Sequence, residues 1–133
     1  MISHVGNRLP ANATAIGKAL LSGLSDQEIR ELYADGLPRL TNHTIVDLDV
    51  LLAQLAEVRK SGIAWEQEES TNQIRCWAVP LCKEGNVFAA LSVSVPLFRC
   101  SEAKEPLVLG SLFKAKKEIE LLTETRNFKL ELI

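Results

Sequence analysis

The sequence predicts an α+β domain in which helices pack on an antiparallel sheet. Three segments with apolar residues at helical spacing come first, three segments in which apolar and polar residues alternate come next, and one more helical segment follows. A short turn containing glycine joins the second and third alternating segments, which is typical of a β-hairpin. Strands grouped in this way favour an antiparallel sheet with separate helices.

Composition limits the class of protein further. A chain of 133 residues, 47% hydrophobic, is long enough for one compact domain over residues 1–133. A net charge of −2 argues against a nucleic-acid-binding surface spread over this domain. No apolar run approaches the roughly 20 residues of a membrane span, and no signal peptide opens the chain. Three cysteines without a Cys-x-x-Cys pair favour a reducing compartment, so we expect a cytoplasmic domain without membrane contact.

The first helix is expected over Ala13–Ser22, with Asn12 as its N-cap. Gly17 lies inside this pattern, where glycine costs about 1 kcal/mol relative to alanine. A glycine at such a position indicates that another backbone or a ligand comes close.

Two further helices begin at clear capping signals. Ser25 and Glu28 form a capping box for a helix over Asp26–Ala34. Asp47 caps a longer helix over Leu48–Arg59, which Gly62 ends. The apolar stripe of the longer helix is Leu48, Leu51, Leu52, Leu55 and Val58.

From residue 63 the apolar period changes to two. Strands are expected over Ile63–Glu69, Ile74–Cys82 and Asn86–Val95, and a last helix over Glu105–Thr123. The tail over Phe128–Ile133 alternates like a strand. A sheet of three strands leaves edges to cover, as if earlier strands were missing from its front.

The register of the hairpin decides which side chains share a face. A three-residue loop, Lys83–Gly85, pairs Cys82 with Asn86 and sets Cys76 opposite Ser92. A four-residue loop would mix the two faces. In the favoured register one face carries Cys76, Ala78, Ala90, Ser92 and Ser94. The other carries Trp77, Val79, Leu81, Val87, Ala89, Leu91, Val93 and Val95, and is the expected core face for helices.

A face of Cys, Ala and Ser side chains leaves room above it. A closely packed helix, water or a ligand can fill that room, and the residues leave these alternatives open. The hydroxyls of Ser92 and Ser94, two residues apart on one strand, are placed to bind one small polar ligand.

The segment Gly6–Leu21 resembles the start of the ligand-sensing half of IclR-type bacterial transcription regulators, with its "RLP-x-x-A-T-A-x-GKA-L-L" pattern. The likeness continues in order over roughly residues 5–122. Further matching pieces are Gly36-Leu37, Thr41–Ile45, Val58-Arg59-x-x-Gly62, Glu68-Glu69, Ile74-Arg75-Cys76-x-Ala78-x-Pro80 and Ala89–Ser94 with Pro96. Each piece is weak alone, but their order and spacing make the resemblance specific.

The resemblance implies a GAF-like effector-binding domain of a homodimer or homotetramer. In that family the effector-binding domain follows an N-terminal winged helix-turn-helix that binds DNA, and we expect that unit to be absent from this chain. The family's effector-binding domain also begins with strands upstream of the first motif. The implied effectors are small organic acids, including keto, sugar and aromatic acids. Residues carried over as effector-binding are Thr14, Ala15, Ile16, Gly17, Glu66, Cys76, Ser92 and Ser94. Two positions depart from the family pattern, which often has Asp at Glu66 and Gly near Gln73.

The mechanism expected from these residues places a small carboxylate at the N-terminus of the Ala13–Ser22 helix, where free amides and the helix dipole favour an anion. Ser92, Ser94 and the Cys76 thiol would bind its other oxygens. Glu66 beside an anion is unfavourable unless it is protonated or accepts from a ligand hydroxyl, and the second option favours hydroxy or sugar acids. Binding would shift the protomers and alter DNA affinity in the whole regulator.

Two other functions stay open. A GAF-like thiol redox enzyme would use Cys76 as nucleophile with Cys82 or Cys100 resolving, although no histidine lies near it in sequence. A ligand-free dimerisation module would fill the small-residue face with protein side chains. We expect no enzyme activity, no cofactor and no metal, because His4 and His43 lack ligands at metal-site spacing.

The remaining polar and aromatic residues have ordinary structural interpretations. Lys18 is expected at the surface or as a cap, and Glu68 and Glu69 on a solvated face. The exposed side of the last helix is expected to carry Lys114, Lys116 and Lys117. Cys82 and Cys100 are expected to be small buried residues, and Trp65 and Trp77 core or interface anchors.

Overall fold

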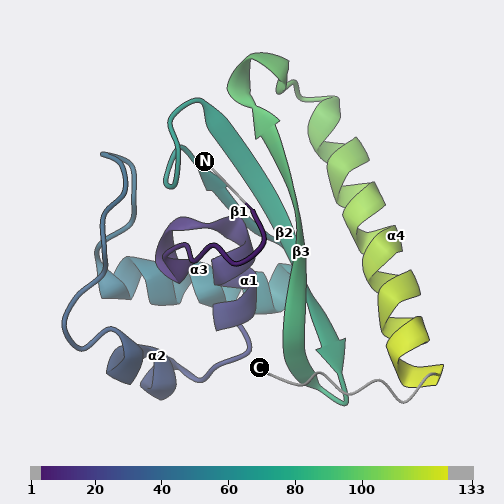
Figure 1. The fold of residues 1–133 in the computed structure, drawn as a ribbon, viewed down its shortest axis with the longest axis horizontal. Coiled ribbons are helices and arrows are strands. Elements are labelled where there is room, and N and C mark those ends of the chain that lie inside the picture. The colour runs from purple at the N-terminus through teal and green to yellow at the C-terminus, as the bar shows by residue number, and fades with distance from the viewer. Residues whose placement is uncertain (1–3, 126–133) are drawn as a thin grey trace.

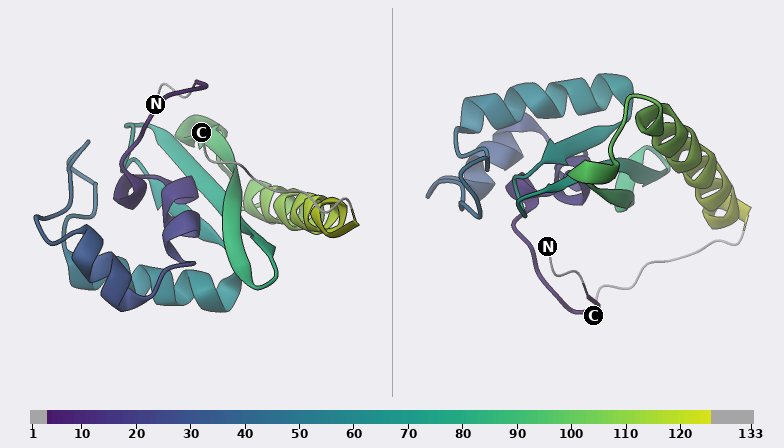
Figure 2. Two further views of the ribbon diagram at one scale, coloured as in Figure 1. Left: turned by 60° about the horizontal axis from the view of Figure 1, so that its bottom comes forward. Right: turned by 90° about the horizontal axis from the view of Figure 1, so that it is seen from above.

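The computed structural model describes residues 4–125, and the predicted tail strand lies outside them. Three antiparallel strands form one sheet in the order β1-β2-β3, with helices on both faces (Figure 1). α1 contacts all three strands from one face and also contacts α3, whereas α4 covers the other face (Figure 2). The elements are η1 (Ala11–Ala13), α1 (Ala15–Leu21), α2 (Asp26–Leu32), α3 (Leu48–Ser61), β1 (Ala64–Gln67), β2 (Ile74–Lys83), β3 (Asn86–Pro96), η2 (Leu97–Arg99) and α4 (Lys104–Thr125).

The first helix begins later than expected. Thr14 is its N-cap, and the Thr14 Oγ1 accepts a hydrogen bond of 2.9 Å from the Gly17 amide. Asn12, predicted to be the cap, is instead buried, and its Nδ2 donates to the carbonyls of Pro38 and Ile45 at 3.0 Å each. The prediction was wrong because both residues can cap a helix, and the long-range partners of Asn12 are not visible in local sequence.

α2 and α3 begin at the predicted caps. Both hydrogen bonds of the capping box between Ser25 and Glu28 are present. Asp47 accepts from the amides of Asp49 and Val50, and Gly62 ends α3 with a φ of 76°, in the left-handed region. Of the predicted stripe, the four members Leu51, Leu52, Leu55 and Val58 are buried. Local signals therefore placed these helices to within two residues.

The hairpin register differs from the predicted one by one residue at the pairs next to the turn and by two residues beyond them. Lys83 pairs with Asn86, so the loop has two residues, Glu84 and Gly85, with φ of 53° and 81°. An irregularity between Leu81 and Cys82 then shifts the ladder, so that Cys76 lies opposite Ser94 rather than Ser92. The predicted turn was wrong, but the extra residue restores the parity of the pairing beyond it. Both predicted faces survive except at Val87, which pairs with Cys82 and whose side chain lies against Gly23, just after α1.

The face of small residues packs against α1. Ala15 and Ala19 of α1 form a buried cluster with Ala64, Cys76 and Ala78 of the sheet. Alanines on both sides let the helix come close to the strands. Close helix packing, one of the three alternatives for this face, therefore fills most of it.

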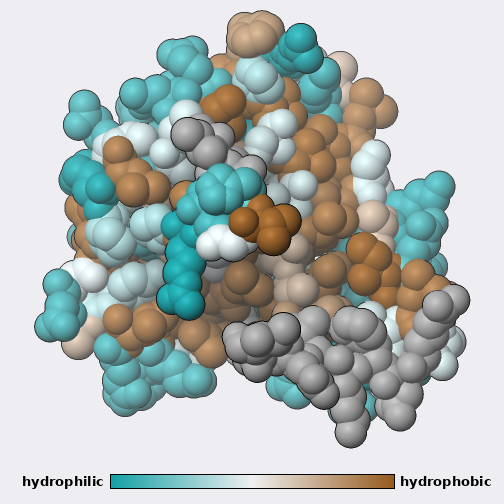
Figure 3. Space-filling model, viewed as in Figure 1, coloured by the Kyte–Doolittle hydropathy of each residue, from teal (hydrophilic) through white to brown (hydrophobic). Residues whose placement is uncertain are grey.

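The opposite face packs against α4. Trp77, Val79 and Val95 form a core cluster with Leu112. Leu122 of α4 is 52% exposed, whereas Lys116, expected on the exposed side, is partly buried and its Nζ donates to the Glu120 carboxylate. Hydrophobic side chains, brown in Figure 3, also reach the surface near α4. No helix within residues 4–125 is long and apolar enough to cross a lipid bilayer.

Candidate functional site

A small cavity remains at the N-terminal end of α1, where the alanine packing stops. Its volume is about 60 Å³, and seven residues line it: Leu9, Thr14, Ala15, Ile16, Cys76, Ser92 and Ser94. The helix start supplies one wall, β2 supplies the thiol and β3 supplies both serines. The space is enough for a few heavy atoms.

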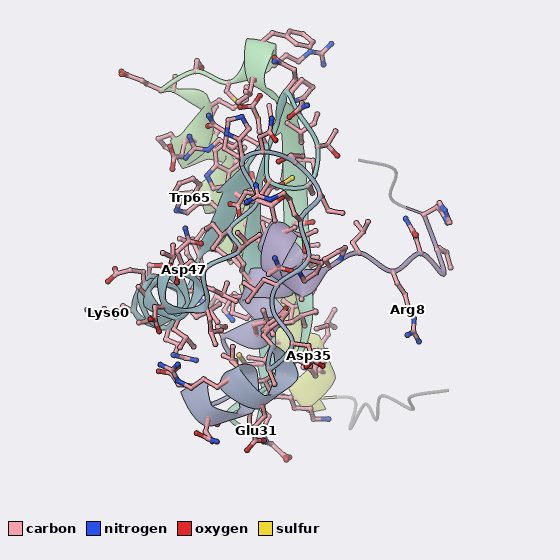
Figure 4. The ribbon with its side chains drawn as sticks, turned by 90° about the vertical axis from the view of Figure 1, so that its left-hand side faces the viewer. Arg8, Glu31, Asp35, Asp47, Lys60 and Trp65 are labelled. Atoms are coloured by element: carbon pink, nitrogen blue, oxygen red, sulfur yellow. The ribbon has the colours of Figure 1, made fainter. Side chains whose placement is uncertain are left out.

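Six of the eight predicted site residues line this cavity, and two do not. Gly17 instead faces Ala11, whose backbone a Cβ on Gly17 would overlap, so the predicted close approach is by backbone and not by ligand. Leu9 lines the cavity although the prediction omitted it; its place directly before Pro10 in the family motif was the available signal. Arg8 next to it projects away from the body of the molecule (Figure 4).

A thiol and a hydroxyl meet in the cavity lining, with the buried thiol as its floor. The Cys76 Sγ and the Ser94 Oγ lie 3.0 Å apart, and Cys76 is 3% exposed. Burial raises the pKa of the Cys76 thiol to about 12; the Ser94 hydroxyl lowers it and the Glu66 carboxylate raises it. The thiol is therefore protonated at neutral pH and acts as a weak hydrogen-bond donor.

α1 has only seven residues. A helix of two turns adds little dipole, so the predicted role of the helix dipole in holding an anion is much reduced. The amides of Ala15 and Ile16 precede the first intrahelical bond, from the Lys18 amide to the Thr14 carbonyl at 3.0 Å. These two amides have no acceptor within the helix, so they are the hydrogen-bond donors that the start of α1 can offer to a ligand in the cavity.

Glu66 lies beside the cavity and not in its lining. It is Cα partner to Cys76 in the sheet, on the same face, and its side chain is fully buried. Its Oε2 accepts from the Glu69 amide at 2.9 Å and its Oε1 from the Ser70 hydroxyl at 3.1 Å. These bonds hold the carboxylate in place, next to the thiol that forms the floor.

A buried ion pair adjoins Glu66, and sequence reasoning missed it. Lys18, expected at the surface, is 1% exposed, and its Nζ lies 2.7 Å from the Glu69 Oε2. Glu69, expected on a solvated face, is 5% exposed. Burial raises the pKa of Glu69, and the ammonium of Lys18 lowers it in part. The available signal was weak. Lys18 follows Ala15 by three residues, and residues three apart on a helix lie on the same face.

Both tryptophans and the other two cysteines lie outside the lining of this cavity. Trp77 is buried in the core, whereas Trp65 is 49% exposed on the flank that Lys60 shares (Figure 4). The Arg75 guanidinium stacks on both indoles, 5.1 and 4.8 Å from the ring centres. Cys82 and Cys100, expected to be buried, are partly exposed.

Comparison with known proteins identifies the family. The family model described as "Bacterial transcriptional regulator IclR C-terminal" matches residues 1–121. The chain belongs to this family.

Its relatives include transcriptional regulators and solved domains of such regulators. The HTH-type transcriptional regulator KdgR of Dickeya chrysanthemi is 38% identical over 121 residues, which are 90% of this chain and 40% of that protein. The crystal structure of the C-terminal domain of E. coli KdgR superposes with a TM-score of 0.80 at 35% identity, covering 87% of this chain and 72% of that one.

A third relative has been solved with a ligand. It is a double mutant of the PobR inducer-binding domain from Acinetobacter in complex with 3-hydroxybenzoic acid. It is 36% identical, has a TM-score of 0.78, and the match covers 88% of this chain and 69% of that one. This chain spans less than half the length of the curated IclR-family relatives, which are named as transcriptional regulators or repressors.

Proposed function

We propose that this chain is the effector-binding part of an IclR-type transcription regulator and that a small carboxylate or sugar acid binds in the cavity beside α1. The observation that supports this is the convergence of unrelated segments on one hollow. Thr14–Ile16, Cys76, Ser92 and Ser94 come from a helix start and two strands, and all of them line it.

The polar groups at this cavity are suited to a carboxylate. Ser92 and Ser94 each offer a hydroxyl, and both serines are exposed on β3, which is an edge strand of the sheet formed by residues 4–125, so the cavity opens toward solvent on that side. The amides of Ala15 and Ile16 offer two further donors. Neutral donors converging on an oxyanion hold it without a counter-ion.

The volume favours acids of a few heavy atoms, with larger acids extending through the open side. In the whole regulator, we propose a cytoplasmic homodimer or homotetramer that binds DNA through a winged helix-turn-helix outside residues 1–133. The effector would change DNA affinity by binding more tightly to one protomer arrangement than to another.

The thiol chemistry of the alternative function has little support. A nucleophilic cysteine needs a lowered pKa, and that of Cys76 is raised to about 12. The ligand-free dimerisation module predicts that the cavity binds nothing, so the same experiment separates it from the proposed function.

Calorimetric titration of this chain with glycolate, pyruvate, gluconate and 3-hydroxybenzoate tests the proposal. At least one acid should bind, and Ser92→Ala/Ser94→Ala should weaken its binding about tenfold or more, since two donors to a charged group are lost. Ser111→Ala, an exposed serine on α4, is the matched control and should leave affinity unchanged. Undiminished affinity in the double variant would remove this cavity from consideration, and no binding of any acid would favour the dimerisation module.

A further inference from the structure

Three charged side chains are buried together beside the proposed effector cavity. Lys18, Glu66 and Glu69 are 1%, 0% and 5% exposed. The Lys18 Nζ lies 2.7 Å from the Glu69 Oε2, and the Glu69 amide donates to the Glu66 Oε2 at 2.9 Å. We call these three residues the buried triad. Two carboxylates and one ammonium give it a formal charge of −1, removed from water.

The triad adjoins the cavity from two elements. Lys18 lies one helical turn after Thr14, whose carbonyl accepts from the Lys18 amide. Glu66 is paired in the sheet with Cys76, whose thiol forms the cavity floor. Because paired residues share a face and lie about 5 Å apart at Cβ, a ligand on Cys76 and Ser94 is one residue pair away from the Glu66 carboxylate.

The surroundings of the triad do not neutralise it. The loop after α2 contributes the Ile45 amide, which donates to the Glu69 Oε1 at 3.4 Å, and the Thr41 and Thr44 hydroxyls, which donate to the backbone carbonyls of Glu68 and Glu69. From α3, Gln54 and Glu57 line a groove together with Lys18, and Glu57 is exposed and pairs with Lys60. Within residues 4–125, Lys18 is the one cation that forms an ion pair with either buried carboxylate.

The inference drawn from this rests on the proposed function. We propose that the buried triad selects the effector by charge: a monoanionic acid binds together with about one proton, which Glu69 takes up, and dianionic acids are rejected. The ligand keeps its carboxylate on the serine and amide donors, while a solvent proton adds to a Glu69 carboxylate oxygen to give a neutral carboxyl. Without that proton, two negative charges would face each other in a site of low dielectric.

The raised pKa of Glu69 supports this direction: burial raises it, and a ligand carboxylate placed beside the triad would raise it further. It follows that affinity for a monoanion falls as pH rises, by up to tenfold per pH unit when one full proton is taken up. A neutral ligand of the same shape should bind with no pH dependence.

The test uses three molecules of nearly one size: glycolate, its neutral amide glycolamide, and the dianion oxalate. Each is titrated calorimetrically into this chain at pH 7 in PIPES and in Tris, whose different ionisation heats report protons taken up. Glycolate should take up between half a proton and one proton, and glycolamide none. Oxalate should bind at least tenfold more weakly than glycolate.

Glu69→Gln makes the triad neutral and should abolish the proton uptake. It should also bring the affinity for oxalate to within about threefold of the affinity for glycolate. Glu57→Gln removes the same formal charge from the exposed α3 position and should change neither result. Where Glu69→Gln fails to fold, as judged by far-UV circular dichroism, Glu66→Gln makes the same test. Glycolate binding without proton uptake, or oxalate binding as tightly as glycolate, overturns this inference alone. If neither glycolate nor any other acid binds, both this inference and the proposed function fail.

Discussion

The Cys76 Sγ and the Ser94 Oγ lie 3.0 Å apart on paired residues of β2 and β3, and both residues line the cavity beside α1. The contact depends on the parity of the hairpin pairing. A one-residue slip of either strand would turn one of the two side chains to the α4 face. The contact therefore ties the position of the site to the geometry of the turn at Glu84 and Gly85.

The Cys76 thiol should be chemically inert. Its pKa of about 12 leaves almost no thiolate at pH 8, and it is buried. Iodoacetamide at pH 8 should alkylate Cys82 and Cys100 at least tenfold faster than Cys76, as followed by peptide mass spectrometry. Unfolding the chain in guanidinium should equalise the three rates. Rapid alkylation of Cys76 in the folded chain would contradict the described environment.

Gly17→Ala should destabilise the chain by about 2 kcal/mol or more, because an added Cβ overlaps the Ala11 backbone, which cannot move aside without displacing η1. Gly110→Ala is the matched control in another helix, where the added Cβ meets no atom within 4 Å. The control should stabilise by about 0.5–1 kcal/mol through helix propensity. Urea denaturation measures both, and equal effects of the two changes would refute the packing described for α1.

Glu69 should give the stability a characteristic pH dependence. Burial raises its folded-state pKa above the ordinary 4.5, so between these two values the folded state binds more protons than the unfolded state. The contribution of Glu69 to stability is thus fully present below pH 4.5 and is lost as pH rises through the folded-state value. The stability of the wild type minus that of Glu69→Gln should fall between pH 4 and pH 8.

Urea denaturation at several pH values gives this difference directly. Glu57→Gln, exposed on α3, should give a curve parallel to the wild type. A difference between wild type and Glu69→Gln that increases with pH would mean that Lys18 outweighs burial and lowers the pKa of Glu69.

Asn12→Ala should loosen the loop between α2 and α3. The Asn12 side-chain amide donates hydrogen bonds to the carbonyls of Pro38 and Ile45, and the substitution removes both of these bonds. We expect a loss of about 1–3 kcal/mol and faster hydrogen exchange over residues 38–46. Asn42→Ala, at an exposed position in the same loop, should change neither quantity. Unchanged exchange in Asn12→Ala would show that the loop is held by other contacts.

Much of the fold could be predicted from local signals. The capping box at Ser25, the cap at Asp47 and the glycine at 62 act on residues a few positions away, so they can be recognised in a single sequence. The faces of the hairpin beyond the turn were also predictable: the predicted loop was one residue too long, but the extra residue in β3 offsets that error, so the alternation with period two is kept. The cap at Thr14 could not be predicted, since Asn12 and Thr14 could each cap the helix. The register could not be predicted either, since two turn types could each use Gly85.

The sequence alone determined the α+β class, the order of elements and the face that Cys76, Ser92 and Ser94 share, because caps and side-chain periodicity are local properties of the chain. Only the tertiary structure decided that α1 covers most of that face, leaving a small cavity, and that Lys18 meets Glu69 across 51 residues of sequence. The physical reason is that a buried charge is tolerated only beside its partner, and that partner is chosen by packing between distant segments, which no local pattern encodes.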